Sequence, residues 1–235
     1  MAESLVLLLD YDGTLVPFAA TPDEAAPDAA LCNLLRELAR RPRTHTHIVS
    51  GRDRCSLERW LGDLAIGIHA EHGYWMRRSG SLSWAAVDEV DSAQIAMILA
   101  GVMRITETVG GRVERKEAGI AWHFRDVPLD VATVATVFDA LHRAFTGTRY
   151  EVLAGDCVIE MRRRGVHKGL VAERVRQWHG GVATMVAFGD DHTDEDLFRA
   201  LPEGSVSVKV GVRDSVATYR VADHQSVRSL LADLL

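Results

Sequence analysis

Three short apolar runs, each ending abruptly at polar residues and glycine, constrain the fold of this chain most strongly. They extend from Leu5 to Asp10, from Thr46 to Gly51 and from Thr184 to Asp191. Each run is too short for a buried helix, and its apolar residues are continuous instead of alternating with polar ones. Continuous hydrophobicity indicates burial on both faces, as in the strands of a parallel sheet that helices cover. The sequence therefore predicts an α/β fold.

The residues between and after these runs have the spacing expected of covering helices. Between the first two runs, leucines recur at helical spacing with charged residues interleaved, which predicts an amphipathic crossover helix. These leucines are Leu31, Leu34, Leu35 and Leu38. After the third run, Asp194 to Ala200 is predicted to be a helix with Thr193 as its N-cap, because acidic residues occupy its first turn. A strand over Ser205 to Val210 and a terminal helix around Val227 to Leu235 complete the pattern.

The middle of the chain has a different pattern. From about Arg77 to Arg162, stretches of alternating polar and apolar residues accompany helical segments near Ala93 to Val109 and Val131 to Phe145. Alternation predicts a sheet with one face packed on helices and the other face open. We therefore expect residues 1–76 and 165–235 to form the parallel-sheet core, and residues 77–164 to form an inserted α+β cap domain.

Charge and cysteine content exclude several classes of protein. The formal net charge of −6 argues against a general nucleic-acid binder, which needs a surplus of basic residues on one face. Three widely spaced cysteines indicate neither a disulfide framework nor a zinc site, and a reducing compartment fits them best. The N-terminal apolar run is too short for a signal peptide, and no apolar stretch approaches the roughly 20 residues of a membrane span. We expect a cytoplasmic protein that binds neither nucleic acid nor membrane.

Acidic residues gather where the predicted strands end. Ligands of an open parallel sheet bind beyond the carboxyl ends of its strands, so the side chains there are candidates for a site. These side chains are Asp10, Asp12, Ser50, Asp190, Asp191 and Asp194. A single aspartate in such a loop is usually just solvated, whereas carboxylates that share one crevice raise one another's pKa unless a cation neutralises them. Hard oxygen ligands favour Mg²⁺ over zinc.

Lys168 supplies a positive charge for an anionic ligand. It lies in the segment Gly165-Val166-His167-Lys168-Gly169, immediately before the apolar helix predicted over Leu170 to Trp178. Its ammonium group and the helix N-terminus both favour an anion. A lone lysine at a helix start is usually a surface residue. Lys168 is a candidate site residue because of its place in the order of the motifs along the chain.

In this order the motifs resemble those of the haloacid dehalogenase (HAD) phosphatase superfamily. They are Asp10-x-Asp12-Gly13-Thr14-Leu15, then Ser50 after a strand, then Lys168, then Gly189-Asp190-Asp191-x-Thr193-Asp194. The resemblance implies a Rossmann-like core with an inserted C2-type cap. It implies that Asp10 attacks phosphorus, that Asp12 protonates the leaving oxygen and then activates water, and that Ser50 and Lys168 hold the phosphoryl group. The implied Mg²⁺ ligands, direct or through bound water, are Asp10, Asp12, Asp190, Asp191 and Asp194.

Over nearly the whole chain the resemblance narrows to trehalose-6-phosphate phosphatases. The similar stretches include Ser50-Gly51-Arg52, Glu71-His72-Gly73, Val113-Glu114-x-Lys116, Ala121-Trp122-His123-Phe124-Arg125 and Val158-Ile159-Glu160-Met161-Arg162. The family hydrolyses trehalose 6-phosphate through an aspartyl-phosphate, as the last step of trehalose biosynthesis. The implied substrate-binding residues are Gly51, Arg52, His72, Gly73, Glu114, Lys116, Arg125, Glu160 and Arg162. Where relatives often carry Gly-Lys, this chain departs from the pattern with Gly155-Asp156.

Alternative functions are compatible with the same motifs. Another capped sugar phosphatase, acting on sucrose phosphate, mannosylphosphoglycerate or a hexose phosphate, would share the core motifs. A phosphomutase must protect its aspartyl-phosphate from water, which Asp12 is expected to activate. A non-catalytic sensor of sugar phosphates would have no reason to retain the complete set of catalytic residues. The expected partner is a small sugar phosphate, and we take a monomer as the expected state, which the sequence itself does not determine.

Overall fold

The computed structural model describes residues 4–19, 22–180 and 183–235. The chain divides into two compact units, each described here by itself. One unit comprises the described residues up to Val87 together with His167–Leu235, and the other is Asp88–Val166. The predicted α/β class with a parallel sheet is confirmed by the first unit, and the second unit is an inserted α+β module.

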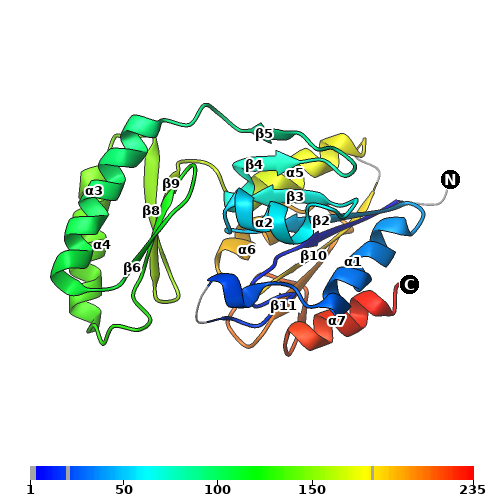
Figure 1. Cartoon of the computed structure of the whole chain (residues 1–235). Helices are drawn as coiled ribbons and strands as arrows, with labels where there is room; N and C mark the ends of the chain where they lie inside the picture. Colours follow the sequence, from blue (N-terminus) through cyan, green and yellow to red (C-terminus); the bar gives the residue numbers. More distant parts are fainter. Residues whose placement is uncertain (1–3, 20–21, 181–182) are drawn as a thin grey trace. The chain divides into compact units, whose positions relative to one another are not determined.

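An eight-stranded sheet forms the centre of the first unit, in the order β12-β11-β10-β1-β2-β3-β4-β5 (Figure 1). The strands are β1 (Leu5–Leu9), β2 (Thr44–Val49), β3 (Gly67–Ala70), β4 (Trp75–Arg77), β5 (Trp84–Ala86), β10 (Thr184–Gly189), β11 (Val206–Val210) and β12 (Tyr219–Val221). Pairing is parallel from β12 through β3. The three apolar runs of the sequence form β1, β2 and β10, which are neighbours in this sheet.

The insertion begins later than the sequence predicts. Strands β4 and β5 extend the large sheet in antiparallel pairing, with Trp75 opposite Ala86 and Arg77 opposite Trp84. Residues up to Val87 therefore belong to the first unit, whereas the predicted boundary after residue 76 would divide β4. The return to the first unit at His167 is close to the predicted position of 165.

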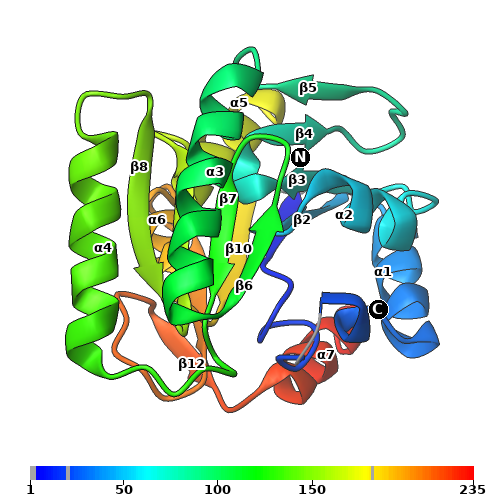
Figure 2. The same ribbon diagram turned by 60° about the vertical axis from the view of Figure 1, so that its left-hand side comes forward.

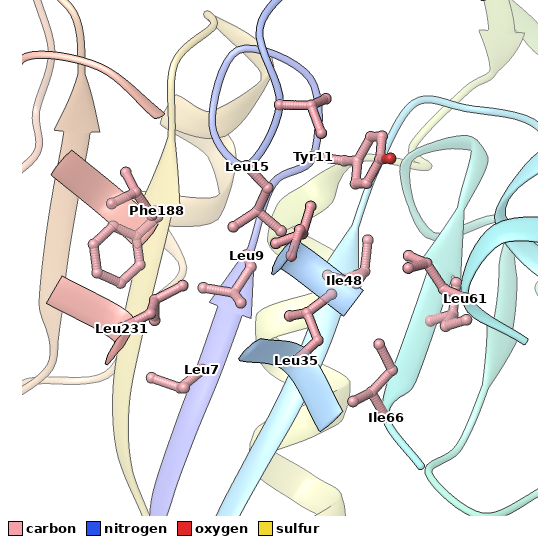
Figure 3. Packing of buried hydrophobic residues seen from close by; sticks show 14 of the residues in the cluster. Leu7, Leu9, Tyr11, Leu15, Leu35, Ile48, Leu61, Ile66, Phe188 and Leu231 are labelled. Carbon is pink, nitrogen blue, oxygen red and sulfur yellow. The ribbon is translucent and has the colours of Figure 1, made fainter. Parts of the chain in front are cut away.

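Helices cover both faces of the large sheet. On one face pack α1 (Ala29–Arg40), α2 (Arg54–Leu61) and α7 (His224–Ala232), and on the other pack α5 (Lys168–Trp178) and α6 (Thr193–Arg199). Strand β1 serves both faces: Leu7 and Leu9 join the cluster with the α1 and α7 leucines (Figure 3), while Val6 and Leu8 contact the α5 side. Full burial stabilises the fold by about 1.5–3 kcal/mol per such side chain. These residues therefore account for the central position of β1.

The helix ends differ from prediction where side chains cap them. Helix α7 begins at His224, because the Asp223 side chain accepts the Ser226 N–H. Helix α6 begins at Thr193 itself, so Thr193 is not the N-cap that the sequence predicted. The side chain of Asp194 instead accepts the N–H groups just before the helix, at Asp190 and Asp191. Two short 3-10 helices, η1 (Pro22–Ala25) and η2 (Glu71–Gly73), complete the unit.

The second unit is a four-stranded antiparallel sheet with two helices against one face (Figures 1 and 2). Its elements are α3 (Ser92–Val109), β6 (Arg112–Arg115), β7 (Ile120–His123), α4 (Val131–Phe145), β8 (Tyr150–Gly155) and β9 (Val158–Arg163), with strand order β6-β7-β9-β8. Ile120, Trp122, Ile159 and Met161 are fully buried with the two helices. The residues that alternate with these four along β7 and β9 lie on the opposite face of the sheet. Across the described parts of both units, the model has no helix long and apolar enough to cross a membrane.

Candidate active site

Strands β1, β2 and β10 bring the predicted site residues to one edge of the sheet. Asp10 follows β1, Ser50 follows β2 and Asp190 follows β10. The backbone N–H of Asp10 donates to the Phe188 carbonyl at 3.0 Å, and the N–H of Ser50 donates to the His69 carbonyl at 2.9 Å. Sheet pairing therefore continues one residue beyond the strands and holds these side chains in register.

Three carboxylates and one ammonium group form a buried cluster at this edge. Oxygens of Asp10, Asp190 and Asp194 all lie within 4.8 Å of one another. The Nζ of Lys168 donates to Asp10 Oδ1 at 2.6 Å and to Asp194 Oδ1 at 2.7 Å. The side chain of Lys168 is 3% exposed and that of Asp194 is fully buried. One ammonium group cannot neutralise three carboxylates, so the cluster retains excess negative charge.

Burial and the clustered charges shift the pKa values of Asp10, Asp190 and Lys168. Burial, reinforced by the charge of Asp194, raises the pKa of Asp10 well above its ordinary value. The same causes raise the pKa of Asp190 to about 6. Burial alone would lower the pKa of Lys168, but the charges of Asp10 and Asp194 outweigh it and raise that pKa. Lys168 is therefore an ammonium ion near neutral pH.

The cluster fits a hard divalent cation. No donor among the described residues reaches Asp10 Oδ2, which is buried. A buried carboxylate oxygen without a partner is unfavourable by about 1–3 kcal/mol or more, and a bound cation removes that penalty. The three candidate ligands are all carboxylates, which suit Mg²⁺ better than zinc. Asp10, Asp190 and Asp194 are thus the residues that could hold the metal.

Glycine is required at two positions for this cluster to assemble. A Cβ on Gly189 would lie 2.2 Å from Asp194 Cγ, so only glycine lets Asp194 fold back to its hydrogen bonds with the β10 loop. Gly13 has φ +75°, and a Cβ there would lie 2.5 Å from the Asp190 carboxyl group. Beside it, Thr14 Oγ1 donates to Asp190 Oδ1 at 3.4 Å. The first acidic motif therefore contacts the second through Gly13 and Thr14, whereas Gly189 makes room for Asp194 within the second motif.

Asp12 and Asp191, also predicted as metal ligands, lie outside this three-carboxylate cluster. Asp12 accepts two hydrogen bonds from Arg52, at 2.7 Å from Nε and 2.6 Å from Nη2. Asp191 Oδ1 lies 3.1 Å from His192 Nδ1 and 3.6 Å from an Arg213 nitrogen. Burial would raise the pKa of Asp191, but the hydrogen bond with His192 outweighs it and the pKa falls below its ordinary value. A metal role for either residue stays a prediction.

The loop after β3 packs against the end of β2. Ser50 is buried, and its Oγ accepts the Arg52 N–H at 3.1 Å. A Cβ on Gly51 would lie 2.8 Å from the His72 ring. Glu71 and His72 both have positive φ, at 48° and 59°, and such residues cost of order 1 kcal/mol or more each. The structure thus brings Ser50, Gly51 and Arg52 beside the loop of His72 and Gly73. The phosphoryl-holding role of Ser50 and the substrate contacts of the other four stay predictions.

The open face of the second unit's sheet carries paired charges. Lys116 contacts Glu160, His123 Nε2 lies 2.8 Å from Glu114 Oε2, and Arg162 Nε donates to Glu151 Oε1 at 2.9 Å. Burial would raise the pKa of Glu114, but the hydrogen bond with His123 and the charge of Lys116 outweigh it and lower that pKa to about 2. Four of the predicted sugar-binding residues therefore share one face: Glu114, Lys116, Glu160 and Arg162.

Two residues of the second unit, His123 and Arg125, have contacts that the sequence did not predict. His123 was not predicted to have a role, although it alternates with the buried Trp122 and so must point to the open face. Arg125 was predicted to bind sugar with Glu114, but its Nη2 instead contacts the Asp156 carboxylate at 3.1 Å. The sugar-binding role predicted for Arg125 stays a prediction.

Comparisons with known proteins agree with the geometry. A family model described as trehalose-phosphatase matches residues 8–231. Over 99% of its length the chain is 40% identical to the bifunctional trehalose-6-phosphate synthase/phosphatase of Thermoproteus tenax, of which it covers 32%. The chain spans about a third of the length of the curated relatives that it matches.

Solved structures give the same result at the level of the fold. The C-terminal domain of the C. albicans trehalose-6-phosphate phosphatase matches with a TM-score of 0.84 and 28% identity, covering 99% of this chain and 92% of that one. A haloacid dehalogenase-like hydrolase from Bacteroides thetaiotaomicron matches over the full length of both chains, with a TM-score of 0.71 and 14% identity. The second match shows a shared fold alone.

Proposed function

Because this chain belongs to the trehalose-phosphatase family, we propose that it hydrolyses trehalose 6-phosphate to trehalose and inorganic phosphate with Mg²⁺ as its cofactor. The observation that carries the proposal is the position of Asp10. One of its oxygens is bound by the Lys168 ammonium group, and the other is buried without a donor from the described residues. A carboxylate held in this way beside a cation is suited to attack a phosphate ester.

Asp10 is the nucleophile of this proposal. Its carboxylate attacks phosphorus, the bond from phosphorus to the sugar oxygen breaks, and an aspartyl-phosphate remains on Asp10. Repulsion between carboxylate and phosphate opposes this attack, and Lys168 reduces it because its ammonium group lies 2.6 Å from Asp10. Asp10, Asp190 and Asp194 would hold Mg²⁺, which would supply the remaining positive charge.

Asp12 moves the protons and Ser50 binds the phosphoryl group. Asp12 donates a proton to the departing sugar oxygen and then accepts one from the water that hydrolyses the aspartyl-phosphate. The Oγ of Ser50 accepts the Arg52 N–H, which leaves its own hydroxyl hydrogen available for a phosphoryl oxygen. The cycle consumes one water and regenerates both aspartates.

Sugar recognition is assigned to the paired charges on the second unit's open face. Carboxylates such as Glu114 and Glu160 accept hydrogen bonds from neighbouring sugar hydroxyls, each worth about 1.5–3 kcal/mol when one partner is charged. Lys116 holds the Glu160 carboxylate, whereas Arg162 pairs with Glu151, and both cations are proposed to contact sugar hydroxyls themselves. Arg125 lies half-exposed on Asp156 in this structure, so its contribution is expected to be the smallest of the set.

Phosphate release from a panel of esters tests the proposal. The purified protein is incubated with trehalose 6-phosphate, sucrose 6-phosphate, glucose 6-phosphate and mannosylphosphoglycerate, in Mg²⁺, in EDTA and in EDTA with Mg²⁺ restored. Trehalose 6-phosphate is expected to have the highest kcat/KM, with activity lost in EDTA and recovered with Mg²⁺. A better substrate within the panel would refute the sugar assignment but not the chemistry. Binding of sugar phosphates without any release would support a sensor.

A further inference from the structure

Arg52 and Asp12 form a bidentate, partly buried ion pair, which is held more firmly than an ion pair on the surface. Both carboxylate oxygens of Asp12 accept from Arg52, at 2.7 Å and 2.6 Å, and the two side chains are 15% and 28% exposed. Two parallel N–H bonds fix the plane of a carboxylate as well as its position. The residues are 40 positions apart in the chain, so only the fold brings them together.

The guanidinium group of Arg52 is itself held in place. Its carbon lies 5.0 Å from the centre of the Trp60 ring and 5.8 Å from that of Tyr11, and these two rings stack on each other. Tyr11 is fully buried, and its hydroxyl donates to the Ala25 carbonyl at 2.8 Å. Aromatic faces that flank a guanidinium restrict its rotation and attract its charge.

The backbone of Arg52 is anchored as well. Its N–H donates to Ser50 Oγ at 3.1 Å, and its carbonyl accepts the Glu71 N–H at 2.9 Å. Ser50 is the phosphoryl-binding residue proposed above, and Glu71 begins the loop that carries the predicted substrate contacts His72 and Gly73. The surrounding structure thus holds the Nε and Nη2 nitrogens of Arg52 in position to bind Asp12.

We propose that Arg52 is a positioning residue that acts through Asp12, orienting the carboxylate that exchanges protons with the sugar oxygen and with water. This rests on the proposed function of Asp12. Each carboxylate oxygen has two lone-pair sites, and the fork occupies one on each oxygen, so the other sites remain for the leaving oxygen or for water. The Nε and Nη2 nitrogens both bind Asp12, and this geometry favours the indirect role. The direct substrate contact that the family resemblance implies for Arg52 stays a prediction.

Leaving groups of different acidity separate this role from a direct contact with substrate. Trehalose 6-phosphate and glucose 6-phosphate release an alkoxide that must be protonated, whereas p-nitrophenyl phosphate releases a stable phenolate that needs no proton. Arg52→Met keeps the aliphatic stem over Trp60 but removes the fork, and Arg52→Lys keeps the charge but not the bidentate geometry. Arg59→Ala is the control, since Arg59 is exposed and also lies over the Trp60 ring.

The expected result is a loss that depends on the leaving group and appears in kcat/KM, because kcat/KM does not include hydrolysis of the aspartyl-phosphate, the step that all three substrates share. Arg52→Met should lower kcat/KM for both sugar phosphates by about 10- to 100-fold, the size of a 1 Å misplacement of a catalytic group. Arg52→Lys should be similarly impaired, p-nitrophenyl phosphate hydrolysis should fall much less, and Arg59→Ala should behave like the parent enzyme. Circular dichroism and melting curves establish that each variant is folded.

A double-mutant cycle decides whether the effect passes through Asp12. In an Asp12→Asn background, Arg52→Met should have no further effect on the sugar phosphates, because its partner is already inactive. Additive losses would overturn the inference, as would full rescue by Arg52→Lys, equal losses on all three substrates, or a KM increase confined to trehalose 6-phosphate. If Asp12→Asn alone shows no dependence on the leaving group, the proposed role of Asp12 fails and the inference fails with it.

Discussion

His69 lies wholly buried in β3, with its Nε2 3.1 Å from Nδ1 of His47 on β2. Its ring stacks on Trp178 at 5.8 Å, and no donor or acceptor among the described residues meets its Nδ1. Burial lowers the pKa of His69 to about 3, whereas an unfolded chain has a histidine pKa of about 6.5. Burial and the neighbouring His69 also lower the pKa of His47. The folded protein therefore holds both rings neutral.

The sign and size of the effect on stability follow from these values. Between about pH 3 and 6.5 the unfolded chain binds more protons at position 69 than the folded chain does, so stability falls as the pH falls through this window. Above about pH 6.5 the contribution of His69 is fully present. At pH 5 the loss from His69 alone is about 2 kcal/mol, since the stability changes by about 1.4 kcal/mol for each pH unit below 6.5.

Urea denaturation of the parent protein and of His69→Gln measures this effect. Glutamine keeps hydrogen-bonding capacity towards His47 but does not titrate. Tryptophan fluorescence reports mainly the first unit, which contains every tryptophan except Trp122. The stability difference between the two proteins should shift by about 2 kcal/mol between pH 7.5 and 5.0, in the direction that favours the variant in acid. His224→Gln, a partly exposed histidine in the same unit, gives the background. A pH-independent difference for His69→Gln would refute the reasoning.

Three further predictions concern the active site. Asp10→Asn should abolish release of phosphate while circular dichroism remains unchanged, and a folded variant with turnover would rule out the aspartyl-phosphate. Gly189→Ala should lose activity and melt at a lower temperature, because its Cβ would lie 2.2 Å from Asp194 Cγ; a variant with parental activity and melting temperature would contradict this. Mg²⁺ should raise the melting temperature measured in EDTA, since it neutralises three clustered carboxylates, and an unchanged value would count against the metal site.

The local sequence pattern predicted much of the fold correctly, but not the point at which the inserted unit begins. The apolar runs identified β1, β2 and β10, and helical spacing placed α4 at Val131–Phe145, as the structure has it. The predicted boundary after residue 76 divided β4 and placed β5 in the insertion, and nothing in segments of only three residues indicates which sheet they join. Pairing with β3 decided that question, and pairing is a long-range interaction.

The sequence by itself determined which chemical groups reach the active-site edge. A parallel strand ends where its apolar run ends, so Asp10, Ser50 and Asp190 had to lie at the same edge of the sheet. The need for glycine at positions 13 and 189 is also visible in the motifs, although its cause, the close approach of Asp190 and Asp194, is visible only in three dimensions.

Only the tertiary structure decided which of these groups contact one another. Five aspartates were expected to share one metal. The fold places carboxylate oxygens of Asp10, Asp190 and Asp194 close together, whereas Asp12 forms an ion pair with Arg52. Lys168 reaches Asp10 across 158 positions of sequence. Hydrogen bonds depend on distances of a few tenths of an ångström and on side-chain direction, and both are set by packing between elements that no local sequence pattern encodes.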